Sequence, residues 1–180
     1  MKYVLRATVI MLIVTSTFYS CKQEATANAQ ANTKDTAASV QQINALLDSL
    51  NATAARADYN AYFDLYASDA IFTGTDATER WEKPAFMQWA KPYFDKGKAW
   101  NFSALQRHVY LDSTGDLAWF DELLRTQMKI CRGSGVVVKQ GDDWKIKQYI
   151  LSITMPNAVQ DAATALKQPI EDSVITSLTK

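Results

Sequence analysis

The sequence predicts one α+β domain in which helices come first and a meander of antiparallel strands follows. Between residues 39 and 97, apolar side chains recur at the three- and four-residue spacing of helices. From Trp100 the period changes to two, which is typical of half-buried strands. The polar sequences DSTGD and KQGDD interrupt this second half where a meander needs turns.

Three helices are expected in the first half. Each begins at a capping residue or at a proline in the first turn, and these starts are Ser39, Asp58 and Lys83-Pro84. Gly97 is expected to end the third helix, and Pro92 to kink or shorten its last turn, because proline has no backbone N–H. Between the second and third helices, ASDAIFTG predicts a short strand that stops at Gly74.

Four strands are expected in the second half, at about residues 100–112, 117–126, 130–139 and 144–154. The turn near residues 127–129 has no glycine or other turn signal. Pro156-Asn157 closes the domain, which therefore comprises residues 39–157. The tail, residues 158–180, has only a weak helical pattern.

The N-terminus predicts export. Lys2 and Arg6 precede an apolar run over residues 7–14, which is too short to cross a bilayer because a spanning helix needs about 20 residues. A basic start, a short apolar run and a small polar exit predict a signal peptide over residues 1–20. Ser20-Cys21 then resembles the cleavage site of bacterial lipoproteins, in which the cysteine is lipidated. An ordinary signal peptide cut elsewhere, with Cys21 incidental, is the alternative.

Residues 21–38 are expected to be the lipidated cysteine and a flexible tether, because KQEATANAQANTKDTAA has no large apolar residue. The polar residues directly after the cysteine look like a surface-export signal of some Gram-negative lipoproteins. We therefore expect a lipid-anchored protein of the cell envelope, in the outer membrane. Removing residues 1–20 leaves 17 basic residues (19 minus Lys2 and Arg6) and 19 acidic ones, a balance that gives no electrostatic case for nucleic acid.

Three stretches carry a family resemblance: GDLAWFDELL, CRGSGVVVKQGDDWKIKQYILSITMPN and YFDLYASDAIFTGTDATERWEKPAFMQW. They are similar to the SnoaL-like domains of the nuclear transport factor 2-like superfamily, over about residues 40–157. The resemblance implies a cone, in which a curved antiparallel sheet wraps the first helix and leaves an apolar pocket at its open end. It also implies a pocket for a small apolar or amphipathic molecule and a possible homodimer through the outer sheet face. The scaffold hosts enzymes as well as binding domains.

Strand alternation gives the candidate site. If Trp119, Asp121, Arg132 and Gln148 face into the cone, they become its functional groups, and a one-residue slip would reverse these assignments. Asp121 among aromatic residues would be a general base with a raised pKa. The alternative is a structural ion pair between Asp121 and Arg132. Two aromatic residues of the helical half, Tyr66 and Trp81, are further candidates for the cavity wall.

Neither a metal nor a cofactor is expected, because His108 is the only histidine and no ligand spacing is present. GSG at residues 133–135 precedes a strand and is not a nucleotide-binding motif. The leading hypothesis is a small-molecule-binding pocket without established catalysis. The alternatives are an isomerase, cyclase or dehydratase that uses Asp121, and a dimerisation module whose cone is filled by its own side chains.

Overall fold

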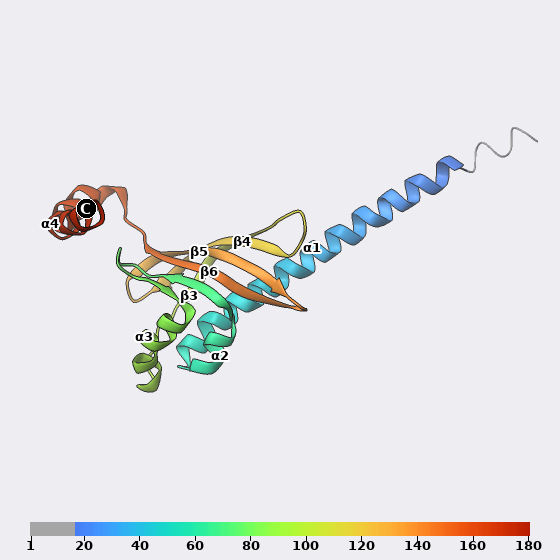
Figure 1. Ribbon diagram of the computed structural model, residues 1–180. Coiled ribbons are helices and arrows are strands. Elements are labelled where there is room, and N and C mark those ends of the chain that lie inside the picture. The colour runs from blue at the N-terminus through green and yellow to red at the C-terminus, as the bar shows by residue number, and fades with distance from the viewer. Residues whose placement is uncertain (1–16) are drawn as a thin grey trace, which may run out of the picture.

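The computed structural model describes the backbone of residues 17–180 and the side chains of residues 35–180 (Figure 1). The charged start and the apolar run of the predicted signal peptide lie outside the described residues. The helices are α1 (Thr17–Ala55), α2 (Tyr59–Asp64), α3 (Lys83–Asp95), the 3-10 turn η1 (Asn157–Val159) and α4 (Gln160–Leu178). The strands are β1 (Tyr66–Thr73), β2 (Arg80–Glu82), β3 (Ser103–Leu111), β4 (Leu117–Thr126), β5 (Lys129–Gln140) and β6 (Asp143–Ile153).

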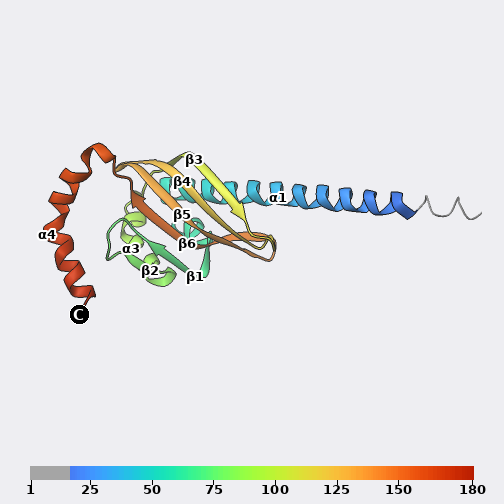
Figure 2. The same cartoon turned by 90° about the horizontal axis from the view of Figure 1, so that it is seen from above.

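The strands form one six-stranded sheet in the order β2-β1-β6-β5-β4-β3. All neighbours are antiparallel except β1 and β6, which are parallel because β1, from the helical half, adds beside the last strand of the meander. The sheet curves around the C-terminal half of α1, and α2 and α3 lie at one end of it (Figures 1 and 2). The predicted α+β cone is confirmed, with a mixed rather than purely antiparallel sheet.

The core lies between α1, the two shorter helices and the concave face of the sheet. From α1 the fully buried side chains are Ile43, Leu47 and Ala54, which recur at the predicted helical spacing. The sheet contributes alternate residues of β4, β5 and β6, and the other helices contribute mainly aromatic rings: Tyr62, Phe63, Phe86 and Phe94. Each fully buried large apolar side chain contributes about 1.5–3 kcal/mol to stability, so this single core can hold the domain without a disulfide.

Helix α1 begins far before the predicted start. Its backbone continues N-terminal to Ser39 as far as Thr17, through the segment predicted to be a flexible tether. The segment has no glycine or proline, and it is rich in alanine, which has the highest helix propensity. A helix already nucleated by its packed C-terminal half extends at little cost. This part of α1 projects away from the domain in Figures 1 and 2.

Helix α3 ends as predicted. Gly97 has a φ of +66°, and the N–H groups of Gly97 and Lys98 donate to the carbonyls of Phe94 (2.9 Å) and Tyr93 (3.1 Å). This is the Schellman arrangement, which satisfies the last carbonyls of a helix. Pro92 does not shorten the helix, which continues to Asp95.

The four predicted strands of the meander are confirmed to within three residues at every end. The turn between β4 and β5 lacks glycine, and Lys129 takes a φ of +73° there. Thr126 stabilises this turn, because its hydroxyl accepts a hydrogen bond from the Met128 N–H (2.9 Å) and donates one to the Lys129 carbonyl (3.1 Å). The three-residue strand β2 was not predicted.

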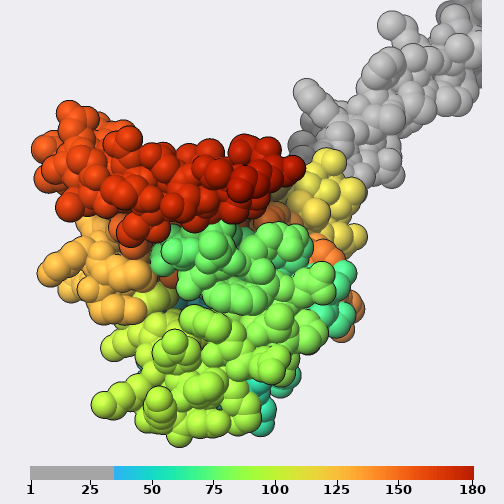
Figure 3. Space-filling model, turned by 60° about the vertical axis from the view of Figure 1, so that its left-hand side comes forward, coloured from blue at the N-terminus to red at the C-terminus, as the bar shows by residue number. Residues whose placement is uncertain are grey.

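The tail forms α4, with Pro169 inside it. None of its side chains is fully buried, and Leu166, Ile170 and Leu178 are largely exposed. Figure 3 shows α4 lying across the outside of the domain. Among the helices of residues 17–180, none has the length and apolar character needed to cross a bilayer.

Candidate ligand pocket

Strand β4 faces the opposite way from the predicted orientation. Its buried side chains are Phe120, Glu122 and Leu124, whereas Trp119 and Asp121 lie on the outer face of the sheet. The prediction that Trp119 and Asp121 line the cone is therefore wrong. The sequence cannot settle this choice from alternation alone, because both sets of alternate residues contain apolar and acidic side chains.

The outer face also holds Arg132 and Gln148. Arg132 is exposed on β5, and its Cα pairs with those of Leu123 and Ser152. On β6 a bulge interrupts the alternation: Val137 pairs with Ile146 but Val136 pairs with Gln148, so that Lys147 is the extra residue. Trp144 and Ile146 face inward before the bulge, Tyr149 and Leu151 face inward after it, and Gln148 moves to the outer face.

The two other predicted residues lie near the cavity but not on its wall. Tyr66 is buried and shares a 2.9 Å hydrogen bond with the hydroxyl of Tyr62. Trp81 is partly buried and stacks on Phe86 and Trp89, behind the rings that face the cavity.

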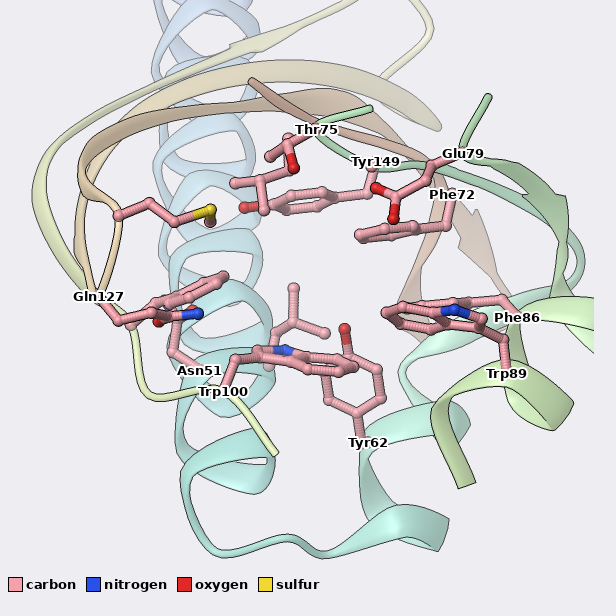
Figure 4. Close-up of a pocket in the computed structure, with 15 residues that line it drawn as sticks. Asn51, Tyr62, Phe72, Thr75, Glu79, Phe86, Trp89, Trp100, Gln127 and Tyr149 are labelled. Carbon is pink, nitrogen blue, oxygen red and sulfur yellow. The ribbon is translucent and has the colours of Figure 1, made fainter. Parts of the chain in front are cut away.

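The cavity has a volume of about 160 Å³ and lies between α1, α2, α3 and the sheet (Figure 4). Its apolar wall is formed by Leu50, Tyr62, Phe72, Phe86, Trp89, Trp100, Phe102, Met128, Tyr149 and Leu151. Its polar groups are few: Asn51, Thr75, Glu79 and Gln127, with Gly74 beside them. An apolar cavity with a small number of polar groups is the usual form of a small-molecule site.

The aromatic rings form two layers. Phe72 lies parallel to Phe86, with centroids 4.1 Å apart and an interplanar angle of 6°, and nearly parallel to Tyr149, at 8°. Phe86 and Trp100 are within 18° of parallel. In Figure 4 the ring of Tyr149 faces that of Trp100 across the cavity, and Phe72 lies beside Tyr149, against Phe86. A ligand between these layers therefore meets ring faces on two sides.

The loop between β1 and β2 brings Thr75 and Glu79 to the cavity. It closes by two hydrogen bonds between Gly74 N and Glu79 O (2.9 Å) and between Glu79 N and Asp76 O (3.0 Å). The hydroxyl and the backbone N–H of Thr78 both donate hydrogen bonds to the Asp76 carboxylate, and these bonds lower the pKa of Asp76. A Cβ at Gly74 would lie 2.1 Å from Glu79 Oε2, so the glycine makes room for the carboxylate.

Beneath the aromatic wall lies a buried polar network. The Tyr149 hydroxyl donates to Glu122 Oε1 (2.8 Å), and Glu122 Oε2 accepts from Arg107 Nε (2.8 Å). Arg107 also donates to the carboxylate of Asp48 (2.8 Å) and to the carbonyl of Asn44 (3.1 Å) on α1. The side chain of Glu122 is 1% exposed, so this network ties the floor of the cavity to α1.

Burial determines the protonation of the tyrosines in this region. Desolvation raises the pKa of Tyr62 and Tyr66, and desolvation together with the neighbouring Glu122 raises the pKa of Tyr149. All three are therefore neutral phenols at neutral pH. For Arg107, desolvation opposes the charge, but Glu122 and Asp48 outweigh it, and the pKa is raised.

Close packing explains both glycines of the GSG sequence: Gly133 packs against this network, and Gly135 packs against the backbone of β6. A Cβ at Gly133 would lie 2.3 Å from the Tyr149 hydroxyl, and one at Gly135 would lie 2.1 Å from the carbonyl of Gln148. Of the Arg-Gly-Ser-Gly residues only Gly133 touches the network, and nothing in the sequence identifies Glu122 or Arg107 as its members.

The outer sheet face carries its own cluster. Tyr110 and Trp119 stack with centroids 5.8 Å apart, and both are more than 40% exposed. Beside them His108 Nδ1 lies 3.2 Å from Asp121 Oδ1, and both side chains are nearly half exposed. The predicted pair of Asp121 with Arg132 is therefore replaced by a pair with His108, its Cα partner on β3.

Comparisons with known structures agree with this fold. A crystal structure of a nuclear transport factor 2-like protein of unknown function from Pseudomonas putida is similar at 19% identity, with a TM-score of 0.57 over 69% of this chain and 92% of that one. A proposed scytalone dehydratase from Novosphingobium aromaticivorans is similar at 13% identity, with a TM-score of 0.60 over 68% of this chain and 89% of that one. At these identities the likeness concerns the fold alone. A search of curated proteins finds no match.

A family model described as the SnoaL-like domain matches residues 43–156. These residues include the part of α1 that packs in the cone, all six strands and every side chain of the cavity wall. The chain therefore belongs to the SnoaL-like domain family, with the nuclear transport factor 2-like fold.

Proposed function

We propose that this protein binds a small apolar or amphipathic molecule in the cavity of its SnoaL-like domain. The observation that supports this most is the cavity itself: about 160 Å³ of space between two aromatic layers, with four polar side chains at its edge. A cone filled by its own side chains, as in a pure dimerisation module, would not have this space. The polar groups are spread around the edge, so they can orient a ligand that the rings hold.

Ligand-observed ¹⁹F NMR with 4-fluorophenol tests the proposal, because this probe has a flat apolar ring and one hydroxyl. The protein is expected to broaden the fluorine signal, and Asn51→Trp is expected to abolish the broadening by filling the cavity from α1. Ala52→Trp is the matched control, since Ala52 is the next residue and is exposed. No broadening with the wild-type protein, or equal broadening with Asn51→Trp, would contradict the proposal.

The alternative, an enzyme, would depend on Tyr149 and Glu122 and not on Asp121. Asp121 lies outside the cavity, whereas Tyr149 lines the cavity and its hydroxyl contacts the buried Glu122. A proton-transfer enzyme of the isomerase, cyclase or dehydratase kind would use this pair, with Arg107 holding the carboxylate. Once a resident ligand is identified, its conversion by the wild-type protein and not by Tyr149→Phe would support this alternative.

We further propose that the domain is carried on a lipid anchor at Cys21, in the cell envelope and specifically the outer membrane. The signal-like N-terminus followed by Ser20-Cys21 supports this. As a helix, residues 21–38 would span about 27 Å between the anchor and the domain. Cys21→Ser is expected to move the protein from the membrane fraction to the soluble fraction, while Ser20→Ala retains it. Membrane retention of Cys21→Ser would contradict the anchor.

A further inference from the structure

The described residues of the cavity wall include a negatively charged side chain and no positively charged one. Among the described residues, Glu79 is the only ionisable side chain on the wall apart from Tyr62 and Tyr149, which are neutral phenols because burial raises their pKa. No lysine or arginine of the described residues lines the cavity, and Arg132, which was expected to face into the cone, is on the outer face. The cavity thus offers a ligand one negative charge and no positive charge.

The carboxylate of Glu79 is available to a ligand. In the described part of the chain it has no ion-pair partner. Its Oε2 instead accepts a hydrogen bond from a backbone group, the N–H of Asp76, at 3.2 Å. The buried carboxylate near the cavity, Glu122, is instead neutralised by Arg107 at 2.8 Å, whereas Glu79 is only partly buried. In Figure 4 the oxygens of Glu79 lie above the ring of Phe72, on the cavity side of the loop.

The faces of the aromatic rings also favour a positively charged ligand. The face of an aromatic ring carries partial negative charge and attracts a cation within about 6 Å of its centroid, most strongly for tryptophan. Trp89 and Trp100 both line the cavity, with centroids 6.4 Å apart, and Tyr149 faces Trp100 from the other side. Ring faces on two sides and a carboxylate at the edge are the groups that recognise organic ammonium ions.

We propose that the ligand class of this cavity is a small organic cation, an amine or quaternary ammonium group held between the ring faces with Glu79 as its counter-ion. The inference rests on the proposed binding function and specifies it. Asn51 and Gln127, on the far side of the cavity in Figure 4, can accept hydrogen bonds from a polar group on the same ligand.

The test compares choline with 3,3-dimethylbutan-1-ol, a neutral molecule of nearly the same shape in which carbon replaces the charged nitrogen. Binding is read from the tryptophan fluorescence of the full chain, since Trp89 and Trp100 lie on the wall. The dissociation constant of choline is expected to be at least tenfold lower than that of the neutral molecule. Glu79→Gln is expected to raise the constant for choline at least fivefold and to leave that for the neutral molecule unchanged.

Glu82→Gln is the matched control. It removes the same charge three residues away, from an exposed side chain that does not line the cavity, and both constants are expected to stay as in the wild type. The cation inference is overturned if choline binds no more tightly than the neutral molecule, does not bind, or keeps its preference in Glu79→Gln. Binding of 4-fluorophenol in the same samples separates this failure from failure of the proposed function, because that probe is uncharged.

Discussion

Glu122 and Asp121 are neighbours on β4, yet their carboxylates have opposite environments. Glu122 is buried between Tyr149 and Arg107, and Asp121 is half exposed beside His108. Burying a charged pair is costly, and removing one partner leaves the other charge without compensation in the interior. The network therefore holds the cavity floor in place, and removing one of its charged members costs more than the loss of one hydrogen bond.

Glu122→Gln is expected to lower the free energy of unfolding by about 3 kcal/mol, because it leaves the buried Arg107 charge with only the exposed Asp48 as an ion-pair partner. Asp121→Asn, its matched control, is expected to cost less than about 1 kcal/mol, since exposed ion pairs contribute little. Urea denaturation followed by circular dichroism measures both. Equal losses for the two variants would show that the environments have been assigned wrongly.

The buried tyrosines predict a loss of stability at high pH. Tyr62, Tyr66 and Tyr149 have raised pKa values in the folded state because of burial, so the folded protein keeps protons that the unfolded chain releases above about pH 10. Their stabilisation is complete below that pH and is lost as the pH rises, by up to about 1.4 kcal/mol per pH unit for each tyrosine. Urea denaturation between pH 9 and about pH 11.5 measures the slope. Tyr66→Phe should reduce it, and Tyr93→Phe, on the exposed face of α3, should not; a flat profile would contradict the burial.

At the scale of elements, the strands and the α3 terminus follow from local sequence. Alternation gave the strand bounds, and Gly97 gave the helix end through its positive φ. Local sequence does not determine which side chains of β4 point into the core, because Trp119 is as apolar as Phe120 and Asp121 is as acidic as Glu122. Only the complete sheet, in which Arg107 of β3 meets Glu122, selects one face.

Two other features lie beyond local sequence. The bulge at Lys147 carries no glycine, so nothing in β6 signals that Gln148 leaves the inner face. Residues 21–38 are helical although they include no large apolar residue, because a helix that extends a packed one does not need such residues. The cavity residue Glu79 lies on a loop, where periodicity has no meaning.

The turn between β4 and β5 gives a prediction at this scale. Lys129 has a φ of +73°, a conformation that costs a side chain about 1–2 kcal/mol and costs glycine nothing. Lys129→Gly should therefore raise the free energy of unfolding by about 0.5 kcal/mol, after the greater chain entropy of glycine is subtracted. Lys139→Gly, at the other end of β5, should lower it by about 0.5–1 kcal/mol. A loss of stability in both variants, measured by thermal denaturation, would contradict the strain.

For the whole molecule, the exposed outer sheet face supports the proposal of a homodimer. Tyr110 and Trp119 form a stacked aromatic patch there, and such residues are enriched in protein interfaces. Leu117, at the start of β4, adds exposed apolar surface to this side. Two such faces pairing across a twofold axis would bury the patch and leave both cavities open at the other side of the sheet.

Analytical ultracentrifugation is expected to show a dimer for the wild-type protein and a monomer for Trp119→Lys, whose charge would be buried at the interface. Tyr93→Lys is the control, because Tyr93 is equally exposed but lies on α3. A wild-type monomer, or a Trp119→Lys dimer, would contradict pairing through this face.

The cavity between the two aromatic layers is the central claim, and a crystal structure of the protein in complex with 4-fluorophenol tests it most directly. Electron density for the probe is expected between the rings of Trp100 and Tyr149, within reach of one of the polar side chains at the cavity edge. A cone closed by its own side chains, with the probe absent or bound only at the surface, would contradict it.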